Sequence, residues 1–135
     1  MEAQKLELES TIESLKEVEK LVDQVCVEYK VNEDYYGNIL IAVTEAVNNA
    51  IIHGNKQNPQ KKYYVTFMPK EDQIIFTIAD QGEGFDYNNL PDPTDPQNIE
   101  KPNGRGVFLM KNLADKIEFE ENGSKVNISF KIFNN

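Results

Sequence analysis

The chain has 135 residues, of which 39% are hydrophobic and 27% charged, and its formal net charge at pH 7 is -9. This size and balance are typical of one globular domain with a single core, which needs neither disulfides nor a structural metal. The negative charge argues against direct binding to nucleic acid, and no segment approaches the roughly 18 apolar residues that a membrane span needs.

A short strand and a helix are predicted at the start of the chain. Leu6 and Leu8 alternate with charged residues, which suggests the strand. From Ser10 to Tyr29, apolar residues recur at spacings of three and four, the pattern of an amphipathic helix. Ser10 and Glu13 have the spacing of a capping box, so we expect them to cap this helix.

Cys26, the only cysteine, lies in this apolar pattern and excludes an internal disulfide. A buried core thiol is favoured over a reactive or metal-ligating one. An unpaired thiol also favours a reducing compartment, and we therefore expect a cytoplasmic protein.

A second helix should run from an N-cap at Asn32 to Gly54. Its core face is marked by five apolar residues: Leu40, Val43, Val47, Ala50 and Ile51. Gly54 is expected to end the helix as a C-cap in the left-handed conformation.

Two strands, 62–68 and 73–79, should pair as an antiparallel hairpin around the polar turn 70–72. The region 81–103 then loses all periodicity and becomes rich in Gly, Pro, Asn and Asp. Loops of this length in a compact domain are often lids or binding segments, and a disordered spacer is the alternative.

The chain should close with a helix at 107–114 and two strands, 117–120 and 126–132, joined by the turn Asn122-Gly123. The expected order is strand, helix, helix, strand, strand, loop, helix, strand, strand. This order predicts an α+β fold, a two-layer sandwich with helices on one face of a largely antiparallel sheet, in one domain that spans 1–135.

Three local motifs could carry chemistry. In the first, Glu45 and Asn49 lie four apart on the second predicted helix, so they share one face. An amide oxygen there could bind Mg²⁺ together with substrate phosphates, and the carboxylate could deprotonate a nucleophile. Such a pair is more often a solvated helix face.

The second motif is Asp80, Gly82 and Gly84, at the end of a predicted buried strand. The carboxylate could accept a hydrogen bond from an exocyclic amino group such as that of adenine, while the glycines let a ligand approach the backbone. An ordinary glycine-rich turn is the alternative.

The third motif, Gly104-Arg105-Gly106, leads into the third predicted helix. Backbone amides at a helix start bind phosphate readily, and Arg105, the only arginine, could add a bidentate contact. A plain glycine turn is equally compatible. Walker, Rossmann and protein-kinase signatures are absent from the sequence.

Together and in this order, the three motifs resemble the N, G1 and G2 boxes of the GHKL ATPase superfamily, which includes DNA gyrase and the histidine kinases. The stretches EAVNNAIIHG (45–54), PDPTDP (91–96) and GRGVFLM (104–110) resemble the bacterial anti-sigma-factor serine kinases more closely than other members. The resemblance spans essentially the whole chain. The glycine series of the G2 box is short here, which leaves the phosphate contacts in doubt.

The resemblance implies the Bergerat ATP-binding fold, a two-layer α/β sandwich with a mixed, largely antiparallel sheet and a lid at about 86–103. It also implies ATP and Mg²⁺ as cofactors. Glu45 would be the catalytic base, Asn49 the Mg²⁺ ligand and Asp80 the adenine contact. The remaining nucleotide-binding residues would be Gly82, Gly84, Gly104, Arg105 and Gly106.

The activity that the resemblance implies is transfer of the ATP γ-phosphoryl to a serine of an anti-sigma-factor antagonist, with regulation of a sigma factor and formation of a homodimer. A non-catalytic, ATP-dependent switch that binds a regulator is one alternative. An isolated histidine-kinase catalytic domain is another, but such domains usually carry an amide where this chain has Glu45. His53, the only histidine, is not expected to accept phosphate, because the chain has no room for a separate helical acceptor domain.

Overall fold

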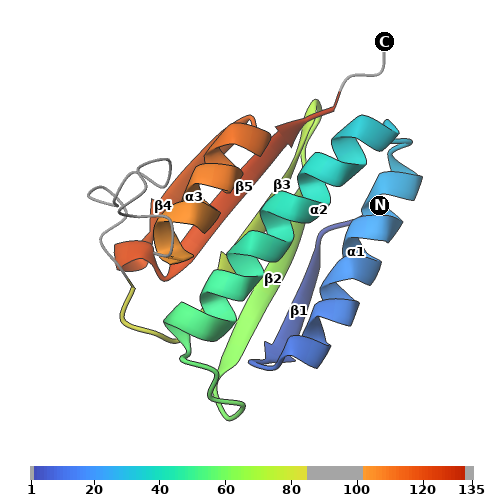
Figure 1. The fold of residues 1–135 in the computed structure, drawn as a ribbon. Coiled ribbons are helices and arrows are strands. Elements are labelled where there is room, and N and C mark those ends of the chain that lie inside the picture. Colours follow the sequence, from blue (N-terminus) through green and yellow to red (C-terminus); the bar gives the residue numbers. More distant parts are fainter. Residues whose placement is uncertain (1, 85–101, 133–135) are drawn as a thin grey trace.

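Five strands and three α-helices make up the part of the chain that the computed structural model describes, residues 2–84 and 102–132, without the side chains of 102–105. They form two layers, with the helices on one face of the sheet (Figure 1). The order of elements agrees with the order predicted from the sequence. The α+β fold with two layers is therefore confirmed.

The sheet has the strand order β1-β2-β3-β5-β4. All four pairings between its strands are antiparallel, so within the described residues the sheet is antiparallel rather than mixed. The expected hairpin is the β2–β3 pair, in which Thr66 lies opposite Thr77. The strands are β1 (Gln4–Glu9), β2 (Lys62–Pro69), β3 (Gln73–Ala79), β4 (Lys116–Glu120) and β5 (Lys125–Lys131).

Three α-helices cover the sheet: α1 (Leu15–Glu28), α2 (Glu33–Asn48) and α3 (Pro102–Leu113). The apolar stripe predicted for the first helix faces the core, since Val18, Val22 and Val25 are fully buried. Asn32 caps α2 as expected, and its side chain accepts a hydrogen bond from the Asp34 amide at 2.9 Å.

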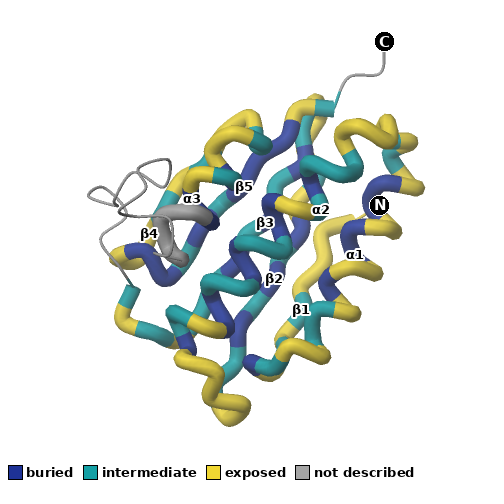
Figure 2. The backbone as a smooth tube through the Cα atoms, viewed as in Figure 1, coloured by how far each residue is buried: buried dark blue, intermediate teal, exposed yellow. Residues whose placement is uncertain are grey.

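The core lies between the two layers and is made of buried residues from the helices and the strands, which are marked in dark blue in Figure 2. Three phenylalanines run across its centre. The ring of Phe76 lies 5.5 Å from that of Phe67 and 6.5 Å from that of Phe130, within the range of favourable aromatic pairs. Each buried ring contributes about 1.5–3 kcal/mol, so these contacts help to hold the centre of β3 against β2 and β5.

The predicted capping box at Ser10 and Glu13 is wrong. A 3₁₀ turn (Ile12–Ser14) follows β1, and α1 begins only at Leu15. The Ser10 hydroxyl is buried and donates to the Lys61 carbonyl at 2.8 Å, so it cannot cap a helix. A partner 51 positions away, brought close by the β1–β2 pairing, has replaced the local one.

The predicted left-handed cap at Gly54 is also wrong. Among the described glycines, a positive φ is found at Gly84 and Gly123 instead. Beyond α2 the chain continues as a π-helical segment, Asn49–Gly54, which the Asn55 amide ends with a bond to the Ala50 carbonyl at 2.8 Å. Single π-helical turns are often found at functional sites.

The third helix begins at Pro102, five residues earlier than predicted. Proline suits the first position of a helix, because its φ is preset and its missing amide would have had no partner there. The predicted lid, 86–103, falls outside the described residues except for its last two positions, which are part of α3.

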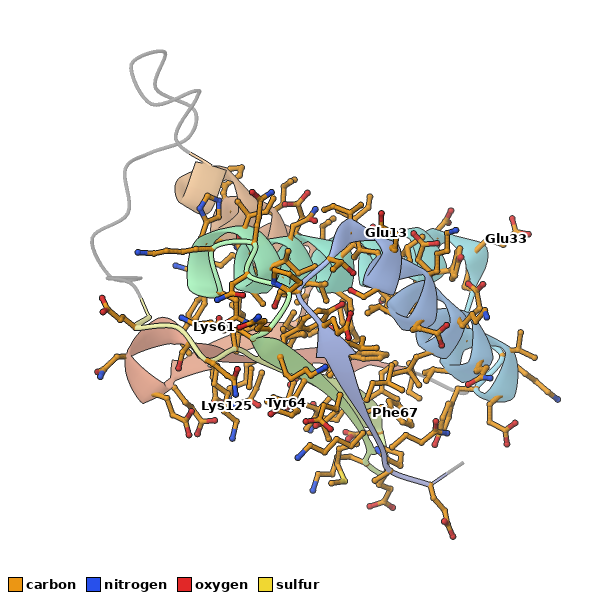
Figure 3. The ribbon with its side chains drawn as sticks, turned by 90° about the horizontal axis from the view of Figure 1, so that it is seen from below. Glu13, Glu33, Lys61, Tyr64, Phe67 and Lys125 are labelled. Carbon is orange, nitrogen blue, oxygen red and sulfur yellow. The ribbon has the colours of Figure 1, made fainter. Side chains whose placement is uncertain are left out.

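No described element covers the face of the sheet opposite the helices. Figure 3 shows Tyr64 and Lys125 on this outer face. Its side chains are largely polar and partly bonded to one another, as between Thr77 and Asn127 at 2.7 Å, which is typical of a sheet face in contact with water. None of the helices described here is long and apolar enough to cross a membrane.

Candidate functional site

An open cavity lies between the helical layer and one end of the sheet. The space inside it that the centre of a water-sized sphere can reach has a volume of about 60 Å³. Apolar side chains form part of its wall, and polar groups from separate segments face them. The lining residues are Ala46, Asn49, Ala50, His53, Gly54, Ile78, Asp80, Gly84, Met110, Phe119, Gly123, Ser124 and Val126.

Asp80 lies in the cavity wall directly after β3, where the sequence places it. Its amide donates to the Ser124 carbonyl at 2.9 Å, and its Oδ1 accepts from the Gly82 amide at 2.7 Å. Burial raises the pKa of this carboxyl, while the Gly82 hydrogen bond and the positive charge of Lys61 act in the opposite direction. The structure therefore holds a hydrogen-bond acceptor in a fixed place in a partly apolar cavity.

Two glycines allow this carboxylate its position. A Cβ atom on Gly54 would lie 2.3 Å from Cγ and Oδ2 of Asp80, far inside van der Waals contact. A Cβ atom on Gly82 would lie 2.1 Å from the Gly54 carbonyl oxygen. Gly54 is needed because of this close approach, and not for a helix cap.

Gly84 meets a different constraint. Its φ is +84°, and a Cβ atom there would lie 2.0 Å from the Asn122 carbonyl oxygen. The segment that leaves β3 therefore packs tightly on the turn between β4 and β5. Of the two glycines proposed to shape this pocket, Gly84 lines the cavity directly and Gly82 supports Asp80.

Glu45 and Asn49 come together with α3, as their shared helix face predicts. A Cβ atom on Gly106 would lie 3.0 Å from Nδ2 and 3.3 Å from Oδ1 of Asn49, and 3.3 Å from Oε2 of Glu45. The backbone of α3 thus lies against both side chains. Asn49 lines the cavity, and Glu45 lies beside it, half-buried on α2.

The third motif lies in the first two turns of α3. Gly104 and Arg105 belong to the helix, but their side-chain environment is outside the described part of the chain. Gly106 is buried where α3 meets α2. The structure therefore connects the first and third motifs through Gly106.

The Asn49 side chain fits the ligand set of Mg²⁺ in part. Its amide supplies one hard oxygen at the cavity wall, where the glycine at 106 leaves room. In the parts of the chain described, no group of three or more His, Cys, Asp or Glu side chains could hold a metal by itself. A cation bound here would need phosphate oxygens and water as its other ligands.

Several cavity residues were not singled out from the sequence. Ser124 lies next to Asp80 and accepts its backbone hydrogen bond, and the alternating pattern of β5 gives no sign of this. Met110 and Phe119 are apolar wall residues that look like ordinary core positions. His53, at the end of the π-helical segment, lines the same cavity, and burial lowers the pKa of its imidazole.

Asn55 is the other residue that the sequence analysis missed. It directly follows the residue at which the second helix was expected to end, and it is completely buried. The signal that could have found it is weak: an asparagine directly after a glycine is usual in turns.

A protein-family model describes residues 8–130 as a histidine kinase-like ATPase domain. An anti-sigma F factor of Bacillus cytotoxicus is 37% identical over 90 residues, which cover 64% of this chain and 60% of the relative. Serine-protein kinase RsbW of Oceanobacillus iheyensis is 33% identical over 87 residues, covering 60% of this chain and 55% of the relative. The chain thus spans 55–60% of the length of these relatives.

The fold has a solved counterpart in the RsbU and RsbW domains of a Mycobacterium tuberculosis protein. The two structures match with a TM-score of 0.66 over 98% of this chain and 32% of the other, at 13% sequence identity. At this identity the match bears on the fold alone.

Proposed function

Because the chain belongs to the histidine kinase-like ATPase domain family, we propose that it binds ATP in the cavity and transfers the γ-phosphoryl group to a serine of a partner protein. One observation carries the proposal. The Gly106 backbone of α3 lies against Asn49 and Glu45, beside a cavity whose far wall holds Asp80. A carboxylate suited to act as a catalytic base, an amide oxygen suited to a phosphate-bound cation and an acceptor suited to the adenine amino group therefore lie around one cavity.

Asp80 is the adenine contact in this proposal. Its carboxylate accepts a hydrogen bond from the exocyclic amino group, and Gly54 and Gly82 allow the close packing that keeps it in place. Apolar neighbours such as Ile78 and Met110 suit the faces of the ring. Guanine carries a carbonyl where adenine carries this amino group, so the site should select adenine.

The phosphates are proposed to lie near the start of α3, where backbone amides and the helix dipole favour anions. Gly104, Arg105 and Gly106 are the proposed phosphate-binding residues. Asn49 would hold Mg²⁺, which offsets charge on the phosphate oxygens when it is bound.

Glu45 is the proposed catalytic base. It accepts the proton from the incoming serine hydroxyl as the bond from serine oxygen to γ-phosphorus forms and the bond to the β-phosphate oxygen breaks, which releases ADP. The position of Glu45 beside Asn49, one helical turn away, supports this role.

The names of the relatives guide the proposal for partners. They include an anti-sigma F factor and a serine-protein kinase. We therefore propose an anti-sigma-factor antagonist as the phosphorylated partner, a sigma factor as a second partner, a homodimer as the assembly and the cytoplasm as the place of action. The buried, unpaired Cys26 agrees with a reducing compartment.

The test is incubation of the purified protein with radiolabelled ATP, Mg²⁺ and the antagonist-like proteins of its source. Acid-stable label on a mapped serine, lost in a Glu45→Ala variant, is the expected result. Nucleotide-dependent capture of a partner without transfer of label would show a binding switch instead. Acid-labile label on histidine would also contradict the proposal.

A further inference from the structure

The side chain of Asn55 belongs to a buried network of hydrogen bonds. Its side chain is fully buried and makes three hydrogen bonds to three separate segments. Nδ2 donates to Ser10 Oγ at 2.8 Å and to the Lys62 carbonyl at 2.9 Å. Oδ1 accepts from the Gln81 amide at 2.8 Å. The side chain therefore joins the ends of β1 and β2 to the segment that follows β3.

The bond to Gln81 is the one that concerns the site, because Gln81 directly follows Asp80. The Gln81 side chain is fixed as well, since its Oε1 accepts from the Lys62 amide at 2.9 Å. Asn55, Lys62 and Gln81 thus form a closed ring of hydrogen bonds. The backbone on the far side of Asp80 cannot turn without breaking this ring.

Two consecutive residues at the end of the π-helical segment contact the two consecutive residues that follow β3. Gly54 leaves the space that the Asp80 carboxylate fills, and Asn55 binds the amide of Gln81. The two segments thus run side by side, with position 54 beside 80 and position 55 beside 81. The packing of Gly54 and the hydrogen bond of Asn55 together set the direction of the Asp80 side chain.

We infer that Asn55 is a positioning residue for base recognition, which holds Asp80 in the orientation that accepts a hydrogen bond from the adenine amino group. This inference rests on the proposed function, because it assumes that Asp80 contacts adenine. It adds that discrimination between bases depends on a residue that does not line the cavity.

The experiment compares two nucleotides, ATP and purine riboside triphosphate, which differ only in the exocyclic amino group. Their dissociation constants are measured by calorimetry for the wild type, Asp80→Asn, Asn55→Ala and Asn55→Ser. The serine variant keeps a polar group in the buried site but is too short to reach the Gln81 amide. Asn58→Ala is the matched control, since the side chain of this exposed asparagine has, among the described residues, one hydrogen bond, which it accepts from the nearby Gln60 amide at 3.0 Å. Its backbone bonds to Asn55 and Lys61 do not depend on the side chain.

The wild type should bind ATP about tenfold to a hundredfold more tightly than purine riboside triphosphate, the usual effect of one hydrogen bond to a charged group. Both Asn55 variants should lose this preference while keeping their affinity for the purine nucleotide, and Asn58→Ala should keep the preference. If Asn55 had a purely structural role, its variants would bind both nucleotides more weakly and by the same factor. That result would overturn the inference.

The outcomes also separate this inference from the proposed function. A wild type that binds neither nucleotide would overturn both. A preference for ATP that Asp80→Asn abolishes but the Asn55 variants retain would overturn the role of Asn55 alone.

The ring of hydrogen bonds can also be tested in the wild type, so that this test does not depend on whether a variant folds. The Gln81 amide should exchange its hydrogen slowly although the residue is exposed, because its partner is buried. Exchange at the rate of an unstructured amide would refute the ring of bonds.

Discussion

Replacing Gly54 by alanine tests the packing that places Asp80 in the cavity. The new Cβ would lie 2.3 Å from the carboxylate carbon and from Oδ2, and 2.6 Å from Oδ1. Ordinary contact begins near 3.4 Å, so the carboxylate must move by about 1 Å. A movement of this size breaks its alignment with the Gly82 amide and with a bound adenine.

Two effects on stability oppose each other in this variant. Forcing a methyl group into a packed site costs about 1–3 kcal/mol. Replacing a helical glycine by alanine gains up to about 1 kcal/mol through the unfolded state. The net loss should be about 1 kcal/mol, or about 4 °C in melting temperature for a chain of this length.

The effect on binding should be larger than the effect on folding. Loss of a hydrogen bond to a charged acceptor costs about 1.5–3 kcal/mol, so the dissociation constant for ATP should rise by about tenfold to a hundredfold. Calorimetric titration with ATP and a thermal melt measure both quantities on one preparation.

Gly37→Ala is the matched control, because Gly37 lies within α2 and a Cβ there meets nothing within 4 Å. It should stabilise the protein by about 0.5–1 kcal/mol and leave ATP binding unchanged. If Gly54→Ala behaved like Gly37→Ala in both assays, the reasoning about Asp80 would be wrong.

Three further predictions concern single side chains. Glu45→Gln should lower the rate of phosphotransfer by about a hundredfold or more, while its affinity for ATP stays near that of the wild type. A labelled-ATP assay measures this, with the exposed Glu71→Gln as control. Equal transfer by both variants would contradict the role of Glu45. Asp80→Asn should raise the free energy of unfolding at neutral pH, because burial raises the pKa of Asp80 and so makes its charged form costly. The gain should vanish as pH falls below the ordinary pKa of a carboxyl, where Asp80 is protonated in both states; urea titrations at several pH values check this, and a gain independent of pH would oppose it. Burial and the charge of Asp23 raise the pKa of the Cys26 thiol to about 11, so a thiol reagent at pH 8 should react only after denaturation, and fast labelling of the native protein would contradict its burial.

The fold could be predicted because its signals are local. The first helix can be predicted from the spacing of Val18, Val22 and Val25, which follows the helical period. The last strand can be predicted from the alternation of Val126, Ile128 and Phe130 with polar residues. The Glu45 and Asn49 pair follows from the same helical geometry. Asp80 was placed correctly because a buried strand stops just before it.

The remaining features depend on partners far away in the chain. Ser10 has the spacing of a helix cap, but the Lys61 carbonyl takes its hydroxyl once β1 and β2 pair. The requirement at Gly54 arises from Asp80, 26 positions later, and no local pattern carries it. Asn55 looks like a turn residue until the amide of Gln81 comes within reach.

The π-helical segment Asn49–Gly54 has a consequence for how this sequence can vary in length. Its single wide turn carries the chain from Asn49, beside α3, to Gly54, beside Asp80, with one residue more than an α-helix would use. Deleting one residue here would restore the α-helical period of about 100° per residue and leave Gly54 and Asn55 on the side of the helix that faces Asp80 and Gln81. Homologous sequences should therefore be able to differ by this one residue while they keep both walls of the cavity. Loss of a second residue would rotate Gly54 and Asn55 away from Asp80 by about 100°.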